Sequence, residues 1–314
     1  MKKAVLAALV VSLACCAFAQ DAQKSPSNLT DVYHPGARPP VTAQIFYGGG
    51  PILSGSTNVY VVFYGNWPAK SMNIINTYLE HLGGTHFYKV NTTYSDTTGA
   101  HIQNVVNYNP TTNSFHDNYS LGKNLTDAQV QTVVSNAISG GHLPNDQTNG
   151  VYFVLTAKDV AESASFGSFC VVYCGYHSPS TSIVTGETIK YSFVGNPARC
   201  PTACDGNIAL FGDKTTPNGD VGGDGTINIM FHELSESASD PNVGLSNGAW
   251  GDLVTGESGD MCNFVFGTTK VGTNGTHFNE TINHTNYLIQ QMFKVPVTIN
   301  GSGFYTGTCV TSLK

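Results

Sequence analysis

Two nearly continuous apolar runs constrain the fold of this chain more than any other feature. Asn58–Tyr64 and Gly150–Thr156 consist mainly of valine, tyrosine, phenylalanine and other apolar residues. Strands that are apolar on both faces are typical of the middle of a sheet that helices cover. Helical apolar spacing over about 67–82, and a second helix capped by Thr126–Asp127, lie between the two runs. This alternation predicts an α/β fold with a mixed sheet and flanking helices.

The N-terminus has the pattern of a secretory signal. Residues 1–19 contain two lysines, an apolar run and an Ala-x-Ala cleavage pattern. The run is too short to span a bilayer, so we expect no membrane span; a membrane anchor and a lipidated Cys15 or Cys16 are the alternatives. Residues 20–44 predict an extended, proline-containing lead-in, and 45–314 would form a single domain.

The cysteine count fits secretion. Of 8 cysteines, two lie in the signal, which leaves six in the mature chain. In an oxidising compartment six cysteines predict three disulfides, with 15 connectivities to choose from. Four of them would pin an irregular, loop-rich lobe over 163–205, and a zinc site of these four thiolates is the alternative. The six are Cys170, Cys174, Cys200, Cys204, Cys262 and Cys309.

Charge excludes one large class of partners. The net charge is −7, only 11% of residues are charged, and there is no run of lysine and arginine, so we expect no nucleic-acid binding. Asn-x-Ser/Thr sequons would make the chain a glycoprotein in a eukaryotic secretory pathway. The sequons begin at Asn28, Asn91, Asn118, Asn124, Asn274, Asn279, Asn283 and Asn300.

The stretch 228–262 gathers more metal-binding and proton-transferring groups than any other. It begins within a helix predicted over Thr226–Asp240. There His232 and Glu236, four residues apart, lie one turn apart on one face, with Glu233 about 100° round the helix. This is the H-E-x-x-H pattern of zinc hydrolases with Glu in place of the second His. His232 and Glu236 would bind the metal, and Glu233 would act as general base on a bound water.

A third ligand is needed to complete such a site. Glu257 follows Glu236 by 21 residues, a spacing similar to that of thermolysin-type metalloproteases. Asp240, one turn beyond Glu236, is the competing ligand, and Asp260 would orient His232 as its hydrogen-bond partner. Two carboxylates and one imidazole form a harder donor set than usual for zinc. The helix pattern makes Zn²⁺ the first expectation, and the harder donor set makes Ca²⁺ or Mn²⁺ the alternatives.

Other interpretations stay open at this point. The polar helix face can be solvated, with Glu233 and Glu236 paired to Lys or Arg, or the cluster can brace the helix against the loop 257–262. His177 is expected to be an exposed loop histidine, with a place in a cleft as the alternative. Trp67 and Trp250, with the many tyrosines, suggest carbohydrate binding as a third role.

The remaining stretches give weaker expectations. Gly48–Gly50 predicts a tight turn that lines a cleft, and 217–225 predicts a turn with Asp224 or Thr226 as the N-cap of the next helix. Three further elements are expected: a strand at Ile208–Phe211, a helix at about Thr285–Phe293 and a strand at Val295–Ile299.

Several of these stretches, in this order, resemble the plant phosphate-induced protein family, also called EXORDIUM-like. The resemblance covers about residues 45–265 and implies a secreted or cell-wall-associated protein linked to cell expansion and growth. It implies no catalytic residue. The stretches that carry it are Tyr47–Leu53, Val59–Trp67, Gly150–Val160, Phe169–His177, Cys200–Cys204, Pro217–Gly225, His232–Glu236 with Asp240-Pro241, and Glu257–Cys262.

Together these observations predict a secreted protein with a single, zincin-like α/β domain. The leading hypothesis is an extracellular, EXORDIUM-like metal-dependent hydrolase that cleaves a peptide or another wall polymer. The alternative is a non-enzymatic signalling or wall-structural protein in which the acidic cluster binds calcium or is purely structural. Its partner would be a component of the extracellular matrix or cell wall.

Overall fold

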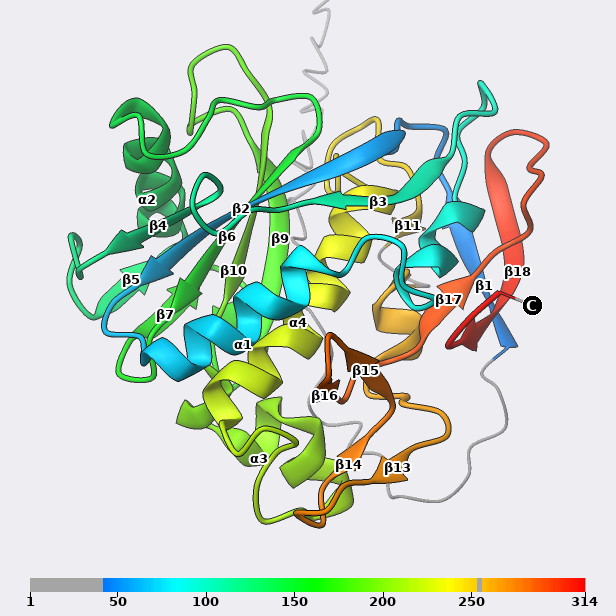
Figure 1. Cartoon of the computed structure of the whole chain (residues 1–314). Helices are drawn as coiled ribbons and strands as arrows, with labels where there is room; N and C mark the ends of the chain where they lie inside the picture. The colour runs from blue at the N-terminus through cyan, green and yellow to red at the C-terminus, as the bar shows by residue number, and fades with distance from the viewer. Residues whose placement is uncertain (1–41, 253–255, 314) are drawn as a thin grey trace, which may run out of the picture.

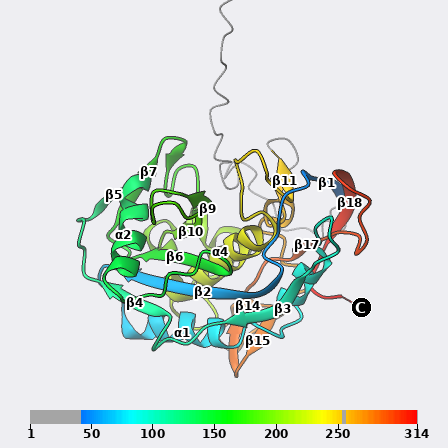
Figure 2. The same cartoon turned by 90° about the horizontal axis from the view of Figure 1, so that it is seen from above.

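The computed structural model describes residues 42–252 and 256–313. A mixed sheet of six strands forms its centre, in the order β3-β2-β6-β10-β9, with β4 beside the second half of β2 (Figures 1 and 2). All neighbours are parallel except β9, which is antiparallel to β10 at the edge. The strands are β2 (Gly55–Tyr64), β3 (Ile102–Asn107), β4 (Ser114–Asp117), β6 (Gly150–Thr156), β9 (Gly175–Ser180) and β10 (Ile189–Val194).

The two apolar runs are the central strands of this sheet, as predicted. Every residue of β6 is buried, and so is every residue of β2 from Val59 to Tyr64. The expectation of a mixed sheet with flanking helices in a disulfide-containing chain is confirmed. The predicted signal over 1–19 and nearly all of the lead-in lie outside the described residues.

Helices cover both faces of the sheet. α2 packs on β2, β6 and β10, whereas α4 packs on β6, β9 and β10 and also contacts α1 (Figure 1). The predicted cap of α2 is confirmed, because Thr126 and Gln129 exchange the two hydrogen bonds of a capping box. The helices are α1 (Ala69–Glu80), α2 (Asp127–Ser139), the short α3 (Pro201–Cys204) and α4 (Val221–Ser239).

α4 begins earlier than its sequence pattern predicts. Asp220 is its N-cap and accepts a hydrogen bond from Gly223 N at 2.8 Å, so neither Asp224 nor Thr226 has that role. The glycines disfavour a helix in isolation. Here they allow close packing: a Cβ on Gly225 would lie 2.7 Å from Asp205 Oδ2.

Smaller sheets complete the molecule around this centre. β1 (Thr42–Tyr47), β18 (Gly303–Val310) and β17 (Met292–Lys294) form an antiparallel sheet in the order β1-β18-β17 (Figure 1). The others are β5 (Asn124–Thr126) with β7 (Ala161–Ala164) and β8 (Gly167–Ser168); β11 (Gly251–Asp252) with β12 (Gly256–Glu257); β13 (Lys270–Val271) with β14 (His277–Phe278); and β15 (Glu280–Ile282) with β16 (Thr285–Tyr287).

Three short predicted elements are wrong. The helix at Thr285–Phe293 is replaced by β16 and β17, and the strand at Val295–Ile299 is absent. Backbone groups there bond to side chains instead: Gln290 N donates to Asn228 Oδ1 at 2.7 Å. The expected strand at Ile208–Phe211 is a π-helical turn, held by a hydrogen bond of 3.0 Å from Ile208 N to Asp205 Oδ1.

Three disulfides link the six cysteines of the described residues, as predicted. They leave no thiolates for the alternative zinc site. The expectation of an irregular lobe over 163–205 is wrong in part, because β9 and β10 lie in this stretch and belong to the central sheet. The pairs are Cys170–Cys200, Cys174–Cys204 and Cys262–Cys309.

Gly48–Gly50 packs against the backbone of another loop instead of lining a cleft. Gly48 N donates to Ala249 O at 2.7 Å, and Gly50 N donates to Gly248 O at 3.1 Å. A Cβ on Gly50 would lie 1.9 Å from Asn247 O, so only glycine fits. This contact holds the loop that follows α4 and leads to Trp250.

Candidate metal site

The helix predicted to carry the site is buried on all sides. Every residue of α4 from Gly222 to Ser239 is buried, including His232, Glu233 and Glu236. The expectation of a solvated polar face is therefore wrong. The hydrophobic stripe along the helix is real, but β9 and the segment 257–260 also cover its polar side.

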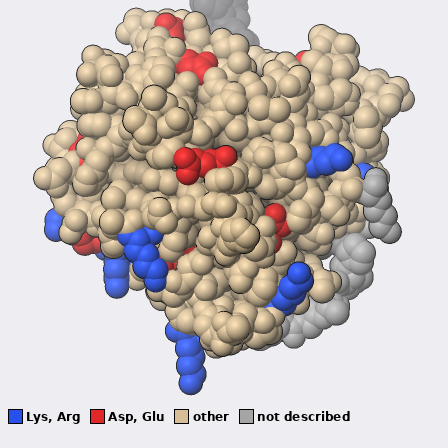
Figure 3. Space-filling model, in the orientation of Figure 1, with Lys and Arg blue, Asp and Glu red and all other residues tan. Residues whose placement is uncertain are grey.

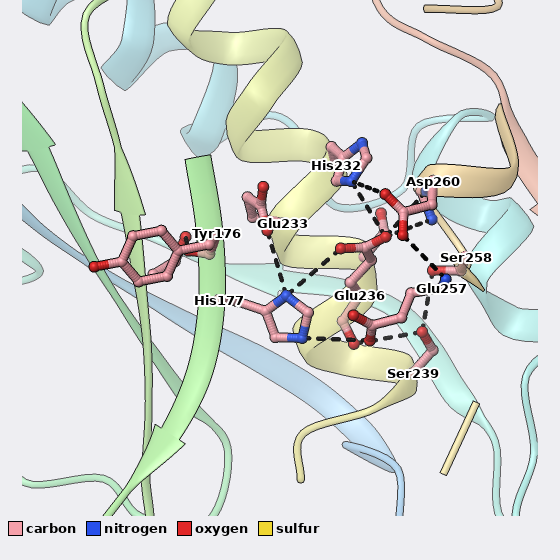
Figure 4. A network of polar contacts seen from close by, with 12 residues as sticks. Tyr176, His177, His232, Glu233, Glu236, Ser239, Glu257, Ser258 and Asp260 are labelled. Carbon is pink, nitrogen blue, oxygen red and sulfur yellow. Dashed lines mark hydrogen bonds and ion pairs between the residues drawn. The ribbon is translucent and has the colours of Figure 1, made fainter. Parts of the chain in front are cut away.

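His177 is the residue that sequence reasoning placed wrongly. It lies on β9, is only 8% exposed, and points at the polar side of α4 (Figure 4). Its Nδ1 lies 3.3 Å from Glu233 Oε2 and 3.5 Å from Glu236 Oε2, and its Nε2 lies 3.5 Å from Glu257 Oε1. Gly175, two residues before His177, is the sequence signal for this close packing. A Cβ there would lie 2.7 Å from Ile229 Cγ2, so glycine allows β9 to approach α4.

His232 faces the other side of Glu236. Its Nε2 lies 3.2 Å from Glu236 Oε1 and 3.7 Å from Asp260 Oδ1. Its Nδ1 lies 3.3 Å from Gln290 Oε1. Gln290 Nε2 donates to Gly259 O at 2.9 Å, which orients the amide so that its oxygen faces the imidazole. Nδ1 of His232 therefore carries a proton, and Nε2 is directed at the carboxylates.

The segment 257–260 closes the cluster from the side opposite β9. Gly259 N and Asp260 N both donate to Glu236 Oε1 at 3.0 Å, and Glu257 is 4% exposed. A Cβ on Gly259 would lie 2.8 Å from the ring of His232, so this position also requires glycine. Glu236 is thus held by two backbone donors and two imidazoles.

The structure arranges the predicted ligands as two overlapping trios. One ligand atom from each of His177, Glu236 and Glu257 lies within 4.8 Å of the others, and the same holds for His232, Glu233 and Glu236. Among the described residues, the predicted trio of His232, Glu236 and Glu257 does not form such a group. Glu236 is common to both, and His177 takes the place expected for His232 beside Glu257.

Asp240 lies apart from these trios. It follows the last turn of α4, and its Oδ1 accepts a hydrogen bond of 2.7 Å from Ala249 N. Burial raises the pKa of its carboxyl to about 6. Its place in the structure is that of a loop anchor beside the cluster.

Electrostatics couple the buried groups strongly. Burial alone would lower the pKa of both imidazoles, but the carboxylates of Glu257, Glu233 and Glu236 raise the pKa of His177 well above its usual value. Those of Glu236, Glu233 and Asp260 raise the pKa of His232 to about 10. Burial raises the pKa of Glu233, whereas the two imidazoles outweigh burial and lower the pKa of Glu236.

A small cavity adjoins the cluster. A cavity of about 20 Å³ is lined by His232, Glu233, Asn228, Phe264 and Gln290, among others. This is enough for about one water molecule. Phe264 has a φ of +54°, which is unusual for a bulky residue. This small cavity has room for an ion or a water.

The tryptophans expected to bind carbohydrate are part of the core. Trp67 and Trp250 are both buried; their indole nitrogens donate to Leu155 O and Ser95 O at 3.0 and 2.9 Å. Neither offers a face to a ligand. Within the described residues, no helix is long and apolar enough to cross a membrane.

Comparisons with known proteins agree with the motifs. Residues 45–298 match the family model described as the phosphate-induced protein 1 conserved region. Protein EXORDIUM-like 3 of Arabidopsis thaliana is 30% identical over 254 residues, which cover 76% of this chain and 73% of that protein. Protein EXORDIUM-like 5 of the same plant is 30% identical over 241 residues, covering 71% of this chain and 64% of the relative.

A tobacco relative extends the comparison. Protein PHOSPHATE-INDUCED 1 of Nicotiana tabacum is 27% identical over 216 residues, covering 62% of this chain and 64% of that protein. The chain thus spans less than two thirds of two of these relatives.

No solved structure matches. The family match covers most of the chain, and the disulfides fit an extracellular protein. The chain belongs to the phosphate-induced protein 1, or EXORDIUM-like, family.

Proposed function

We propose that this protein is a secreted, extracellular metal-binding protein whose buried His–Glu cluster holds one divalent cation. The cation joins α4, β9 and the segment 257–260, which are far apart in sequence. The observation that carries the proposal is the pair of trios that share Glu236, each with ligand atoms within 4.8 Å of one another.

The charge of the cluster supports a cation. Glu233, Glu236 and Glu257 are almost fully buried with His177 and His232. Even with both imidazoles protonated, three carboxylates leave an excess of one negative charge. With the imidazoles neutral, the excess is three. Uncompensated charge is costly to bury, so a divalent ion at Glu236 would stabilise the folded state.

The hydrogen bonds of His232 also support a bound cation. Nδ1 donates to Gln290 Oε1, so in neutral His232 the lone pair of Nε2 faces two carboxylates. Among the described residues, Nε2 of His232 and Nε2 of His177 are buried without a hydrogen bond. In neutral His232, the contact of the Nε2 lone pair with the carboxylates is repulsive unless a proton or a metal ion lies between them. An imidazole that ligates through one nitrogen and donates from the other to an oxygen is the common arrangement in metal sites.

The ligand distances and the imidazole in each trio favour zinc. Ligands about 2.0–2.1 Å from a tetrahedral ion lie roughly 3.3 Å from each other, and the imidazole–carboxylate distances here are 3.2 to 3.5 Å. Imidazole suits Zn²⁺, whereas Ca²⁺ prefers oxygen ligands alone. Zn²⁺ is thus our first assignment, and Ca²⁺ is the alternative.

The test is metal analysis of the secreted protein, purified without chelator, by inductively coupled plasma mass spectrometry. We expect about one zinc per chain in the wild type and in His81→Ala, an exposed histidine outside the cluster. His177→Ala and His232→Ala should lose it. Chelation should lower the melting temperature of the wild type, and zinc should restore it. No metal and no effect of chelator would mean that the imidazoles are protonated and the cluster is purely ionic.

Metal-dependent hydrolysis is a second candidate, in the zincin-like sense predicted from the sequence. The observation that favours it is the cavity at His232 and Glu233, which has room for one water. His177, Glu236 and Glu257 would hold the metal, and Glu233, outside that trio, would act as general base. A peptide or another wall polymer would need an opening of the enclosed cluster.

Glu233→Gln separates the two candidates, because it keeps the shape of the side chain but cannot accept a proton. Retained metal with loss of hydrolysis of a casein or wall-polysaccharide substrate would assign catalysis to Glu233. If neither wild type nor variant hydrolyses any substrate although both hold metal, the structural role stands.

Secretion and glycosylation form part of the same proposal. Asn118, Asn124 and Asn283 are exposed and suitable acceptors, whereas Asn91 is fully buried and donates to Ser235 Oγ at 3.0 Å. We expect glycans at the exposed sites and none at Asn91 in protein secreted by plant cells. Glycopeptide mass spectrometry of the culture medium tests both points, and retention of the protein inside the cell would contradict secretion.

A further inference from the structure

A second concave site lies outside the metal cluster and shares no residue with it. Its volume is about 680 Å³, within the range of pockets that bind small organic ligands. Asn66, Tyr119, Lys158, Asp159 and Arg199 line it, together with the Cys170–Cys200 disulfide.

The polar residues of this pocket come from loops that follow four parallel strands. Asn66 follows β2, Tyr119 follows β4, Lys158 and Asp159 follow β6, and Arg199 follows β10, each within about five residues of the strand's last residue. These strands are neighbours in the order β4-β2-β6-β10. The pocket therefore lies at the carboxyl edge of the sheet, which is where open α/β sheets bind their ligands.

The position along that edge is also distinctive. From β2 the chain passes through α1 to β3 and β4 on one side, and then through α2 to β6 on the other side of β2. The order of strands thus reverses between β2 and β6. Asn66 and Lys158 follow these two strands, so the pocket lies at the topological switch point of the sheet.

Backbone conformation around the pocket is unusual. Tyr119 and Cys170 have φ of +57° and +73°, a region that bulky residues rarely adopt. Gly65 has φ of +91°, and a Cβ there would lie 2.7 Å from the Tyr119 ring. Strained residues held by their surroundings concentrate at binding sites.

The charges of the pocket leave an uncompensated positive pair. Asp159 is already engaged: it accepts from Lys123 Nζ at 2.6 Å and from the Tyr119 hydroxyl at 2.9 Å. Arg199 Nη1 donates to Lys158 O at 3.3 Å, which holds the guanidinium beside the pocket. Among the described residues, no carboxylate forms an ion pair with Lys158 or Arg199. Figure 3 shows the basic side chains of one face at its lower left, at its bottom and at its right, among mostly uncharged residues.

We propose that this pocket binds an acidic saccharide through the carboxylate of a uronic acid. Lys158 and Arg199 bind the carboxylate, since guanidinium and ammonium groups suit it in geometry and charge. Asn66 and Asp159 bond to sugar hydroxyls, and the Tyr119 ring forms a wall beside the sugar. The volume exceeds what a single inorganic anion fills, and the polar lining does not suit an apolar ligand.

The test is isothermal titration calorimetry of the intact protein with trigalacturonic acid. Arg199→Ala and Lys158→Ala should each weaken binding tenfold or more, whereas Lys89→Ala, an exposed lysine elsewhere, should leave it within about twofold. The fully methyl-esterified trisaccharide, which lacks the charge, should bind at least tenfold more weakly. Higher salt should weaken binding of the acid and not of the ester.

Three outcomes would overturn the assignment. Equal binding of acid and ester would remove the role of the two cations. If millimolar inorganic phosphate displaces the saccharide, and the pocket binds phosphate and saccharide with equal affinity, the pocket is a general anion site. Absence of heat with trigalacturonate, confirmed by unchanged amide chemical shifts, would reject saccharide binding. Glu233→Gln should bind the saccharide like the wild type, since the metal cluster is a separate site.

Discussion

The metal cluster and the strand-end pocket show opposite ways of placing charge in one domain. The cluster is sealed: three glutamates and two histidines lie between α4, β9 and 257–260. The pocket is open, and Lys158 and Arg199 are exposed in it. Buried charges depend on each other for stability, whereas exposed charges can be kept for a ligand because water solvates them meanwhile. The first region should therefore govern folding, and the second should govern recognition.

The largest expected effect is that of His177→Ala on stability. Removing this imidazole takes from Glu233, Glu236 and Glu257 the group that brings them a metal ion or a proton, and breaking a buried pair costs about 3–5 kcal/mol. Urea unfolding should show the loss, whereas His81→Ala should change stability by less than about 0.5 kcal/mol. A loss below about 1 kcal/mol in His177→Ala would contradict the ionic coupling of the cluster.

Two disulfides provide a matched comparison of the regions. Cys170–Cys200 lies at the pocket and Cys174–Cys204 lies at the start of β9, and each spans 30 residues. The loops are equal, so chain entropy predicts a similar loss of about 3–4 kcal/mol for either double serine variant. Only the variant without Cys174–Cys204 should also lose metal, and only the other should lose saccharide affinity. If both double serine variants lose metal and saccharide affinity to the same extent, the two regions are not independent.

A buried carboxyl group on β7 should make stability depend on pH. Burial raises the pKa of Glu162 on β7 to about 7 from 4.5, although hydrogen bonds from Tyr173 and Tyr176 oppose the shift. The folded state keeps this proton up to about pH 7, whereas the unfolded state releases it near 4.5. This contribution is thus full below pH 4.5 and is lost as the pH rises towards 7, by about 1–3 kcal/mol.

Glu162→Gln tests this sign, because the amide does not titrate. Chemical denaturation at pH 5 and pH 7.5 should show a smaller loss of stability in the variant than in the wild type. An equal pH dependence in both proteins would mean that other groups cause it. Tyr173→Phe, which removes one donor to the carboxylate, should increase the loss at pH 7.5.

The smallest expected effect is that of the pocket cations on stability. Arg199→Ala and Lys158→Ala remove exposed side chains whose charges water already solvates, so each should change unfolding free energy by less than about 0.5 kcal/mol. Thermal unfolding alongside the calorimetry checks this. A loss comparable with that of His177→Ala would mean that the pocket is structural, and the contrast between the two regions would fail.

Much of the fold could be predicted from local pattern. The runs at Asn58–Tyr64 and Gly150–Thr156, the capping box at Thr126, and the spacing of His232 and Glu236 all depend on residues close in sequence. Strand period, helix capping and the reach between positions i and i+4 are properties of the backbone itself. These features therefore appear in the sequence before any tertiary contact is known.

Tertiary structure decided what surrounds those features. His177 joins Glu233 across 56 residues only because β9 packs on α4, and the pocket assembles from loops after four separate strands. The glycine-rich start of α4 is helical because close neighbours stabilise it, and the chain near Gln290 is extended because side chains such as Asn228 bond to its backbone. Spacing in a sequence fixes what can lie together within one element. Packing between elements decides which distant groups meet, because burial and long-range hydrogen bonds outweigh the weak local propensities.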